Sequence, residues 1–497
     1  MKIAGLDIGT TGCKLSVFDE NGKYLDRVYQ DYPIKRSKNE HEINVEVIWD
    51  KVIEIIQTMA KKYPDIIGIG VTSFGETFVL TDNDGKPLHH ALLYTDPRGR
   101  EECEELSQKI GNTRISAITG VKPHEMYSIS KLMWMKKNKP DIYGRAEHAF
   151  LIADYVVYRL TGNAQTDYSL ASRTMAFNIT SLNWSNEILL TAGIKKELLS
   201  KPVPSGTSAG RILPKLSELT GLNKETIIVS IGHDQLAATV GAGVFDSREA
   251  AEGAGTVECI IPVYDKLPNL KTLYEGGYAV VPYVIPGKYI AYAFSYTGGA
   301  LIQWCVDTLA KKEKELAKNE GISVNELLEG DYEDPTGILV LPHFAGAATP
   351  YMDIGSKGAI LGLTTSSTVR DIYKACMEGV VYEMQINMEQ LRKSGIHFEM
   401  MHATGGGAKS QVWMQMKADV LNIPITALET GDAGTVGSAM LTGVAVGCFE
   451  NLEKAKVCMV EKQQVYKPNM EMHKKYMKIY ERYKCVYDAV RPLVQGE

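Results

Sequence analysis

The sequence predicts an α/β protein of two domains, each built on a mixed sheet flanked by helices. The chain has 497 residues, more than one hydrophobic core of ordinary size holds. Meander strands, a helix and a buried strand follow one another between residues 3 and 72. A strand, a Gly/Thr turn and a second strand occur once in each half, which is an internal repeat of architecture. A Gly-Ala-Gly run and a polar turn at 241–247 place the expected domains at 1–244 and 245–497.

The first of these hairpins predicts strands over 3–7 and 15–18, joined by a tight turn. Such a turn can direct N–H groups and hydroxyls toward one point, and this concavity binds anions. Asp7 at its mouth suits a hydrated divalent cation that accompanies a phosphate. An ordinary hairpin is the alternative. The turn consists of Gly9, Thr10, Thr11 and Gly12.

The rest of the first half alternates apolar strands and amphipathic helices. An Asn-Gly turn leads into a strand over 24–29, a helix is expected over 45–62, and a buried strand over 66–72. A hairpin is expected over 78–88, helices over 128–137 and 153–160, irregular structure over 163–214, a strand over 227–231 and a helix over 236–240.

The second half begins with the other hairpin, whose turn contains Gly255 and Thr256. A triple glycine at 405–407 then marks a strand-to-helix turn. Helices are expected over 301–317, 369–394, 412–421 and 433–447 and in the tail, with a loop over 342–362.

Composition excludes several classes of function. A net charge of −6 argues against a nucleic-acid-binding protein. No apolar run reaches the roughly 20 residues that span a bilayer, and the first residues do not resemble a signal peptide. The eight cysteines show neither a CxxC pair nor zinc spacing, which is typical of free thiols in a reducing compartment. We therefore expect a cytoplasmic protein that acts on small molecules.

Two Gly/Thr hairpins and a triple-glycine turn suit one long anionic ligand. The hairpins would hold phosphates, while the triple glycine lets the backbone approach a ring or a sugar near a helix N-terminus. This combination predicts a nucleotide held in an interdomain cleft.

Several ordered motifs resemble those of the FGGY carbohydrate kinases of the actin-like ATPase superfamily, and the resemblance spans almost the whole chain. Met126 to Asn138 fits the first signature of the family, and 358–378 fits the second apart from Cys376. The other matching segments are Gly5-Leu-Asp7-Ile-Gly9-Thr10-Thr11, Gly232-His233-Asp234-Gln235, Gly298-Gly299 with Gln303-Trp304, and Gly405 to Ser410 followed by Gln415 and Ala418-Asp419.

The resemblance implies two actin-like domains and ATP-dependent phosphorylation of a sugar or polyol hydroxyl, with Mg²⁺. Asp234 matches the catalytic aspartate, a general base; a helix N-cap is its structural alternative. Asp7 would hold Mg²⁺, and Lys14 would offset phosphate charge unless it is an exposed strand lysine. Gln303 is equally compatible with a solvated helix position. The positions implied for ATP and its phosphates are Gly9, Thr10, Thr11, Lys14, Gly255, Thr256, Gly299, Gln303, Gly406, Gly407 and Ser410.

The resemblance to the family also implies which residues bind the sugar or polyol acceptor, although fewer residues match there. Glu76 follows Gly75, where a glycerol kinase would carry arginine. Structural salt bridges or buried aromatic packing are the alternative roles for the acceptor residues. Those implied are Glu76, Tyr94, Asp96, Gln235 and Asp234 itself, with Tyr94 or Met126 as a wall. Two departures, Ala347-Ala348 and Asp432 in place of Glu, leave the phosphate residues intact.

The favoured function is therefore a carbohydrate kinase, acting on a pentulose such as xylulose. Gluconate, glycerol or another polyol is the alternative acceptor within the family, and a homodimer is compatible with it. An actin-like or chaperone-like ATPase without sugar transfer is the alternative of a different class, and a silent sugar-sensing paralogue is a third. Stimulation of ATP consumption by a sugar separates the kinase from the ATPase.

Overall fold

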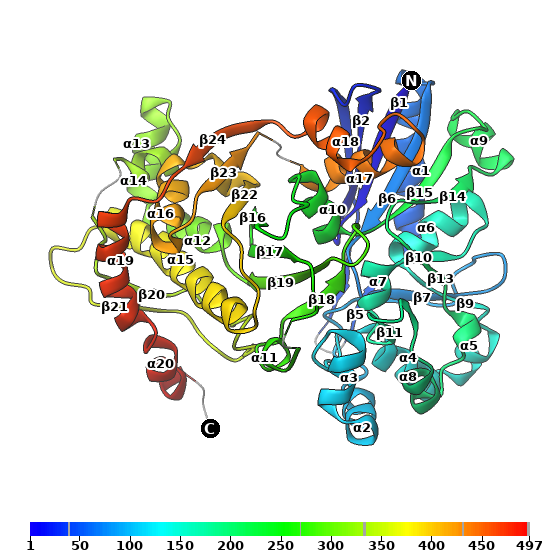
Figure 1. Cartoon of the computed structure of the whole chain (residues 1–497), viewed down its shortest axis with the longest axis horizontal. Helices are drawn as coiled ribbons and strands as arrows, with labels where there is room; N and C mark the ends of the chain where they lie inside the picture. The colour runs from blue at the N-terminus through cyan, green and yellow to red at the C-terminus, as the bar shows by residue number, and fades with distance from the viewer. Residues whose placement is uncertain (38–39, 269, 332–333, 430–431, 495–497) are drawn as a thin grey trace. The chain divides into compact units, whose positions relative to one another are not determined.

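The computed structural model describes residues 1–37, 40–268, 270–331, 334–429 and 432–494 (Figure 1). The chain forms two compact units. Unit 1 contains residues 1–243, 280–290 and 432–460, and unit 2 contains 244–279, 291–431 and 461–497. Unit 1 combines the first half of the sequence with two shorter segments of the second half, whereas unit 2 lies almost entirely in the second half. The expected boundary between residues 244 and 245 stays a prediction about the sequence domains.

Unit 1 is built on a mixed sheet of order β14-β15-β6-β1-β2-β3. Strand β1 is antiparallel to β2 and parallel to β6, which is parallel to β15. Three neighbouring strands therefore end at the same edge, and this edge carries the motif residues described below. The strands are β1 (Lys2–Ile8), β2 (Gly12–Asp19), β3 (Tyr24–Asp31), β6 (Ile66–Ser73), β14 (Thr207–Arg211) and β15 (Ile227–His233).

Helix α1 (Val45–Lys62) has the predicted bounds because its local signals are complete. The Asn44 side chain accepts a hydrogen bond from the Glu46 N–H, and lysines in the last turn suit the helix dipole. Its apolar face is buried, and the helix contacts β2 and β3.

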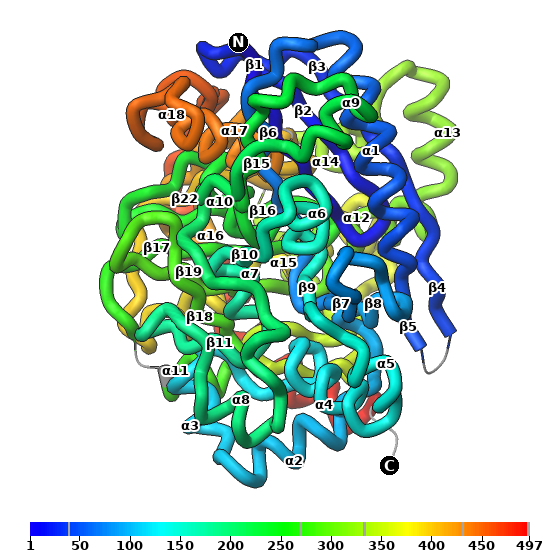
Figure 2. The backbone as a smooth tube through the Cα atoms, turned by 90° about the vertical axis from the view of Figure 1, so that its right-hand side faces the viewer, coloured from blue at the N-terminus to red at the C-terminus, as the bar shows by residue number. Residues whose placement is uncertain are grey.

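Helix α17 (Ala433–Ala445) joins unit 1 from late in the sequence. It packs against α10 (Asp234–Gly241), β1 and β6, and Figure 2 shows it in orange beside these strands. A Cβ atom at Gly437 would lie 1.8 Å from the Ala237 carbonyl oxygen, and one at Gly5 would lie 2.2 Å from that of Thr435. Glycine at these positions lets the backbones approach, which explains the small-residue composition of this helix.

The segment predicted to be irregular, 163–214, is more ordered than expected. Its short helices are started by single capping side chains rather than by long apolar periodicity: Asp167 caps α7 (Tyr168–Ser172) and Ser185 caps α8 (Asn186–Ala192). Small sheets of order β10-β13, β11-β12 and β4-β5-β8-β7-β9 complete the unit. Their strands are β4 (Lys35–Arg36), β5 (His41–Ile43), β7 (Phe78–Thr81), β8 (Ala91–Leu92), β9 (His148–Leu151), β10 (Gln165–Asp167), β11 (Phe177–Asn178), β12 (Asn183–Trp184) and β13 (Lys201–Val203). The remaining helices are α2 (Arg100–Ile110), α3 (Asn112–Thr119), α4 (Ser128–Asn138), α5 (Pro140–Arg145), α6 (Ile152–Thr161), η1 (Lys196–Leu198), α9 (Pro214–Thr220) and α18 (Leu452–Met459).

Unit 2 contains a second mixed sheet, in which β19, β17, β16, β22, β23 and β24 follow in this order. Strand β16 is antiparallel to β17 and parallel to β22. The strands are β16 (Glu249–Ala254), β17 (Glu258–Tyr264), β19 (Tyr289–Ser295), β22 (Met400–Thr404), β23 (Ile425–Leu428) and β24 (Lys462–Tyr466). Shorter strands of unit 2 are β20 (Leu339–Leu341) and β21 (Ala359–Leu361), whereas most residues of β18 (Ala279–Pro282) belong to unit 1. The prediction of two mixed-sheet α/β units is confirmed.

The single helix predicted over 301–317 is wrong. The backbone leaves helical geometry at Ala310, so that α12 (Gly299–Leu309) and α13 (Lys311–Glu320) are separate helices. The apolar α12 packs on α15 (Val369–Lys393), whereas the highly charged α13 packs on α14 (Val324–Glu329). The other helices are α11 (Leu270–Glu275), η2 (Gly406–Lys409), α16 (Gln411–Leu421), α19 (Met470–Tyr483) and α20 (Val486–Val494). Within the described part of the chain, none of the helices has the length and apolarity needed to cross a bilayer.

Candidate active site

The first Gly/Thr turn closes through a hydrogen bond from the Gly9 N–H to the Gly12 carbonyl oxygen, at 2.9 Å. A Cβ at Gly12 would lie 2.3 Å from the Tyr29 hydroxyl, so this glycine is required by close packing. Thr11 is exposed and Thr10 is half-buried at the tip of the turn. Both threonines are therefore accessible, and their role in binding phosphate stays a prediction.

Asp7 and Lys14 face each other across this hairpin as a register pair. The Lys14 ammonium lies 3.0 Å from Asp7 Oδ2 and 2.9 Å from Asp432 Oδ1. Burial lowers the pKa of Lys14, but the two carboxylates outweigh it and raise the pKa overall. Burial raises the pKa of Asp7, the ammonium lowers it and Asp432 raises it. Lys14 is therefore a charged partner of two carboxylates rather than an isolated strand lysine.

The carboxylates of Asp7 and Asp432 fit a magnesium ion. Both supply hard oxygen ligands, and a Cβ at Gly434 would lie 3.0 Å from Asp7 Oδ2, so glycine keeps the space beside this carboxylate open. Among the described residues, no cluster of three or more His, Cys, Asp or Glu side chains could hold a metal by itself. One or two carboxylates, completed by water and phosphate oxygens, is the arrangement that Mg²⁺ uses in kinases.

Asp234 follows β15 and is the first residue of α10. The N-cap position belongs to His233, so the capping role considered for Asp234 does not apply. The His233 N–H donates to Ser169 Oγ at 2.9 Å, and this hydroxyl donates to Asp167 Oδ1 at 3.0 Å. The turn that presents Asp234 is thus fixed by α7. Asp7 and Asp234 come from the same edge of the sheet, at the ends of β1 and β15.

The electrostatic surroundings of Asp234 suit a base. Burial and the charges of Asp7 and Glu76 raise its pKa, Arg173 lowers it, and together they bring it to about 7. Burial and the charge of Arg173 hold the pKa of His233 well below its usual range. The contact of 3.3 Å between His233 Nδ1 and Asp234 Oδ1 therefore involves a neutral imidazole at neutral pH. A carboxyl group that titrates near pH 7 can accept and return a proton.

Two of the predicted acceptor residues lie close to Asp234. The pKa of the Tyr94 phenol is raised first by burial and then by the charge of Glu76, and the charge of Asp234 also raises it. Gln235 is the second residue of α10, and its side chain is half-buried.

Asp96 is engaged elsewhere. Its two carboxylate oxygens accept hydrogen bonds from the Arg98 guanidinium, at 2.8 and 2.6 Å, and from the His41 N–H, at 2.7 Å. Arg98 also pairs with Glu42 at 2.9 Å. This is the structural ion pair that the sequence left open as an alternative. A substrate hydroxyl would have to share a fully occupied carboxylate, and the acceptor role of Asp96 stays a prediction.

Arg173 is a site residue that sequence reasoning missed. It is the C-cap of α7, and its guanidinium pairs with Glu76. The missing signal was local: Asp167 caps a helix of five residues, too short to show periodicity in a segment rich in Ser, Thr and Asn.

In unit 2 the glycine motifs converge on the second hairpin. The Gly299 N–H donates to the Gly255 carbonyl at 2.8 Å, and the Gly298 and Ala300 N–H groups donate to the Thr256 carbonyl, both at 3.0 Å. A Cβ at Gly405 would lie 2.7 Å from the Ala254 carbonyl oxygen. The structure therefore brings together the end of β16, the start of α12 and the triple-glycine turn.

A cavity of about 480 Å³ opens beside the triple-glycine turn, and its volume accommodates a nucleobase. Gly406 is exposed and Gly407 half-buried, while Ser410 caps α16 by accepting from the Trp413 N–H. The Gln303 amide donates to Asp307 at 2.9 Å on an exposed helix face, which matches the alternative of a solvated position. The cavity is lined by Gly405, Ala408, Lys409, Gln411, Leu428, Glu429, Gln463, Gln464 and Tyr466.

A buried cluster of charged side chains connects the two strands of the second hairpin. The Lys417 ammonium forms ion pairs with Glu252 of β16 and Glu258 of β17, and all three side chains are fully buried. It also lies 4.3 Å from the centre of the Trp413 ring. Burial raises the pKa of Glu258 well above its usual range, with Lys417 opposing and Glu252 adding to this effect. The cluster ties both strands of the hairpin to α16.

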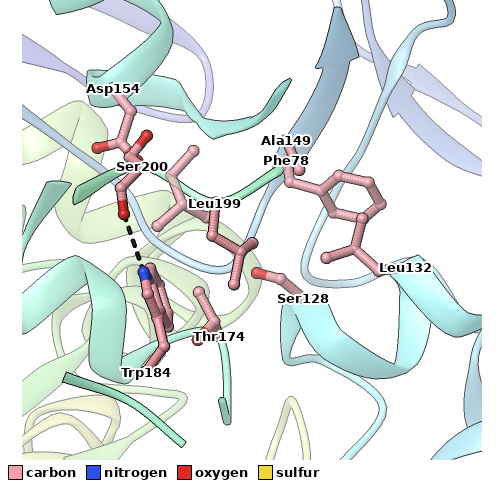
Figure 3. A pocket seen from close by; sticks show the side chains of 10 residues that line it. Phe78, Ser128, Leu132, Ala149, Asp154, Thr174, Trp184, Leu199 and Ser200 are labelled. Carbon is pink, nitrogen blue, oxygen red and sulfur yellow. Dashed lines mark hydrogen bonds between the residues drawn. The ribbon is translucent and has the colours of Figure 1, made fainter. Parts of the chain in front are cut away.

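A smaller cavity of about 10 Å³ in unit 1, lined by ten side chains, holds about one water molecule (Figure 3). Trp184 Nε1 donates to the Ser200 carbonyl oxygen at 2.9 Å on one side. Burial raises the pKa of the Asp154 carboxyl well above its usual range. The cavity is too small for a sugar, and it belongs to the packing of the unit.

Comparison with known proteins identifies the family. Residues 2–241 match the model of the FGGY family of carbohydrate kinases, N-terminal domain, and residues 254–446 match that of the C-terminal domain. The chain is 26% identical to a xylulose kinase of Bacillus subtilis (strain 168), over 99% of this chain and 97% of the relative. It is 30% identical to a glycerol kinase of Thermococcus gammatolerans, over 94% of both chains. The crystal structure of a gluconate kinase from Lactobacillus acidophilus superposes with a TM-score of 0.89, at 25% identity over 98% of both chains.

The two family models together cover most of the chain, in the order that the sequence predicted, and both units carry the corresponding glycine motifs. These matches favour the kinase over the two alternatives, an ATPase without sugar transfer and a silent sugar-sensing paralogue. The chain belongs to the FGGY family of carbohydrate kinases, enzymes that use ATP to phosphorylate a sugar or polyol.

Proposed function

We propose that this kinase phosphorylates a pentulose such as xylulose, with Asp234 as the general base. The observation that carries the proposal is the position of Asp234 at the sheet edge that also presents Asp7, in surroundings that bring its pKa to about 7. Xylulose kinases among the relatives favour a pentulose. The Tyr94-Thr-Asp96-Pro-Arg98 run resembles that of xylulokinases and of gluconokinases alike.

The residues of unit 1 divide the chemical work. Asp234 accepts the proton of the acceptor hydroxyl as the oxygen attacks the γ-phosphorus of ATP. Thr10, Thr11 and the charged Lys14 hold phosphate oxygens. Magnesium, when bound, neutralises the developing charge on the phosphates, and Asp7 with Asp432 would hold it.

The residues of unit 2 bind the rest of the nucleotide in this proposal. Gly255 and Thr256 hold phosphates, while Gly406, Gly407 and Ser410 lie beside the ribose and base. Gly299 acts by allowing α12 to approach the hairpin, as its hydrogen bond to Gly255 supports. Gln303 is assigned to the nucleotide by resemblance alone.

Glycerol or a similar polyol is the second candidate acceptor. The Glu76-Thr77 pair matches the run that glycerol kinases carry, and the glycerol kinase relative is 30% identical. Gly75 in place of arginine is the observation against it.

A coupled ADP-release assay with Mg·ATP tests the proposal against xylulose, other ketoses, glycerol, polyols and gluconate. We expect xylulose to give the highest kcat/KM. Replacing Asp234 by Ala should abolish transfer and retain ATP affinity, whereas the exposed Asp141→Ala should behave as the unaltered enzyme. A higher kcat/KM with glycerol or gluconate would refute the pentulose, and normal turnover of Asp234→Ala would refute the base.

We further propose a cytoplasmic location and a homodimer. Free thiols at all eight cysteines suit a reducing compartment. Light scattering of the purified protein tests the dimer, and a mass of one chain would refute it.

A further inference from the structure

Gly75 leaves a space beside Asp234 that another segment fills. A Cβ at Gly75 would lie 3.0 Å from Arg173 Cγ and 2.9 Å from His233 Cδ2. The aliphatic stem of Arg173 therefore lies against the Gly75 backbone, next to the residue that precedes the proposed base. A side chain at residue 75 would therefore force the His233 ring and the Arg173 stem to shift.

The Arg173 guanidinium is held by Glu76. Its Nε donates to Glu76 Oε1 at 2.5 Å, and its Nη2 contacts the same oxygen. Arg173 is 8% exposed and Glu76 is 4% exposed, so the ion pair is largely shielded from water. The guanidinium also lies 5.2 Å from the centre of the Tyr127 ring. This fixes a planar donor group in one orientation, which suits recognition of neighbouring oxygen atoms.

Glu76 has a strained backbone, which supports a functional role. Its φ angle is 60°, a left-handed conformation that residues other than glycine rarely adopt. The Ser128 hydroxyl donates to the Glu76 carbonyl oxygen at 2.6 Å and holds this conformation. Strain of this kind is found where a side chain must be aimed at a site.

The charges around Asp234 disfavour an anionic acceptor. Asp7 and Glu76 both raise the pKa of Asp234, and Arg173, which opposes them, is already paired with Glu76. Lys14 is likewise shared between Asp7 and Asp432. The carboxylate of an aldonate such as gluconate would add a further negative charge beside Asp7, Glu76 and Asp234, while Arg173 and Lys14 are already paired with carboxylates.

We propose that Arg173, oriented by Glu76, is an acceptor-binding residue that selects neutral polyols and ketoses over aldonates. A glycerol kinase would carry an arginine at the position of Gly75, and in this chain the Arg173 guanidinium takes over that role by donating hydrogen bonds to acceptor hydroxyls. This inference rests on the proposed acceptor site around Asp234, and it extends that proposal to the substrate class.

Steady-state kinetics of the full-length enzyme with xylulose, glycerol and gluconate test it. We expect the unaltered enzyme to prefer both neutral compounds to gluconate. Arg173→Met should raise the KM for the neutral acceptor about 10- to 100-fold, the effect of losing hydrogen bonds from a charged group, with the KM for ATP unchanged. Glu76→Gln leaves the guanidinium charge unmatched and should raise the ratio of gluconate to xylulose use about tenfold.

Two further variants control for folding, because either single change leaves a buried charge without its partner. The double variant Glu76→Gln, Arg173→Met removes both charges and should keep the thermal stability of the enzyme while acceptor binding stays weak. Arg211→Met removes an exposed arginine that pairs with Glu225 at 2.7 Å and should change none of the constants.

The pH profile separates a direct role from a structural one. Removing the positive charge of Arg173 raises the pKa of Asp234, so the acidic limb of kcat/KM should move to higher pH in Arg173→Met. A higher kcat/KM for gluconate in the unaltered enzyme, or an unchanged acceptor KM in Arg173→Met, would overturn the inference. If the enzyme phosphorylates pentuloses but Arg173→Met leaves their KM unchanged, the inference alone fails. If Asp234→Ala remains active, the proposed site fails with it.

Discussion

Replacing Asp234 by Asn should remove activity and stabilise the protein at the same time. Asn keeps the size of the side chain but can neither ionise nor accept the proton of the acceptor hydroxyl. Loss of a general base costs about 10²- to 10⁴-fold in kcat. Because the base acts mainly in the transition state, ATP affinity should remain.

The stability effect follows from the raised pKa. In the folded protein the pKa of Asp234 is about 7, against an ordinary value of 3.8. The folded state thus favours the protonated form, and stability is lost as the pH rises from 3.8 through about 7. The difference corresponds to roughly 4 kcal/mol. Since the side chain is 31% exposed, solvent screening reduces this to about 2 kcal/mol.

Thermal unfolding at two pH values measures this effect. Asp234→Asn should raise the unfolding temperature by about 4–8 °C at pH 8, the change that about 2 kcal/mol produces in a unit of this size. At pH 5, where the folded carboxyl is already protonated, the increase should be less than half as large. The exposed Asp141→Asn is the control and should change neither activity nor stability.

Two results would refute this reasoning. Turnover of Asp234→Asn within a few fold of the unaltered enzyme would show that another group takes the proton. An unfolding temperature at pH 8 that does not rise would show that the carboxylate is not destabilised by its surroundings, and the raised pKa would lose its basis.

The remaining predictions concern pH and packing. The kcat/KM of the unaltered enzyme should fall about tenfold for each pH unit below about 7, as one proton binds to Asp234, and a flat profile from pH 5 to 8 would contradict this. Lys417→Met should destabilise the protein by about 3–5 kcal/mol, because it leaves buried carboxylates without their cation, and adding Glu252→Gln should restore part of this loss. Calorimetry measures both changes. An unfolding temperature of Lys417→Met equal to that of the unaltered protein would count against a stabilising role of the cluster. Gly437→Ala should lower the free energy of unfolding by about 1–3 kcal/mol or more, because the new Cβ would overlap a carbonyl oxygen. Gly144→Ala, with open space around it, should be neutral or stabilising. Equal melting temperatures of the two variants would refute the packing argument.

Much of the fold and part of the site were accessible from the sequence, wherever the information is local. Apolar periodicity was enough to give α1 its bounds, and the structure adds the Asn44 cap. The Gly/Thr turns predicted both hairpins, and Asp7 was found because it lies at the mouth of the first turn. Asp234 was found through the resemblance of Gly232-His233-Asp234-Gln235 to a motif of the family. Where the signal was short, as in α7, or where an apolar helix continued into a charged one at Ala310, the sequence prediction failed.

The sequence by itself determined the two mixed-sheet units, the family and the residues that the motifs carry. Only the tertiary structure decided that Arg173 pairs with Glu76, 97 residues earlier, and that Asp432 shares the ammonium of Lys14. It also decided that Asp96 is occupied by Arg98. The physical reason is that turns and helix caps depend on neighbours along the chain, whereas ion pairs, burial and pKa values depend on neighbours in space.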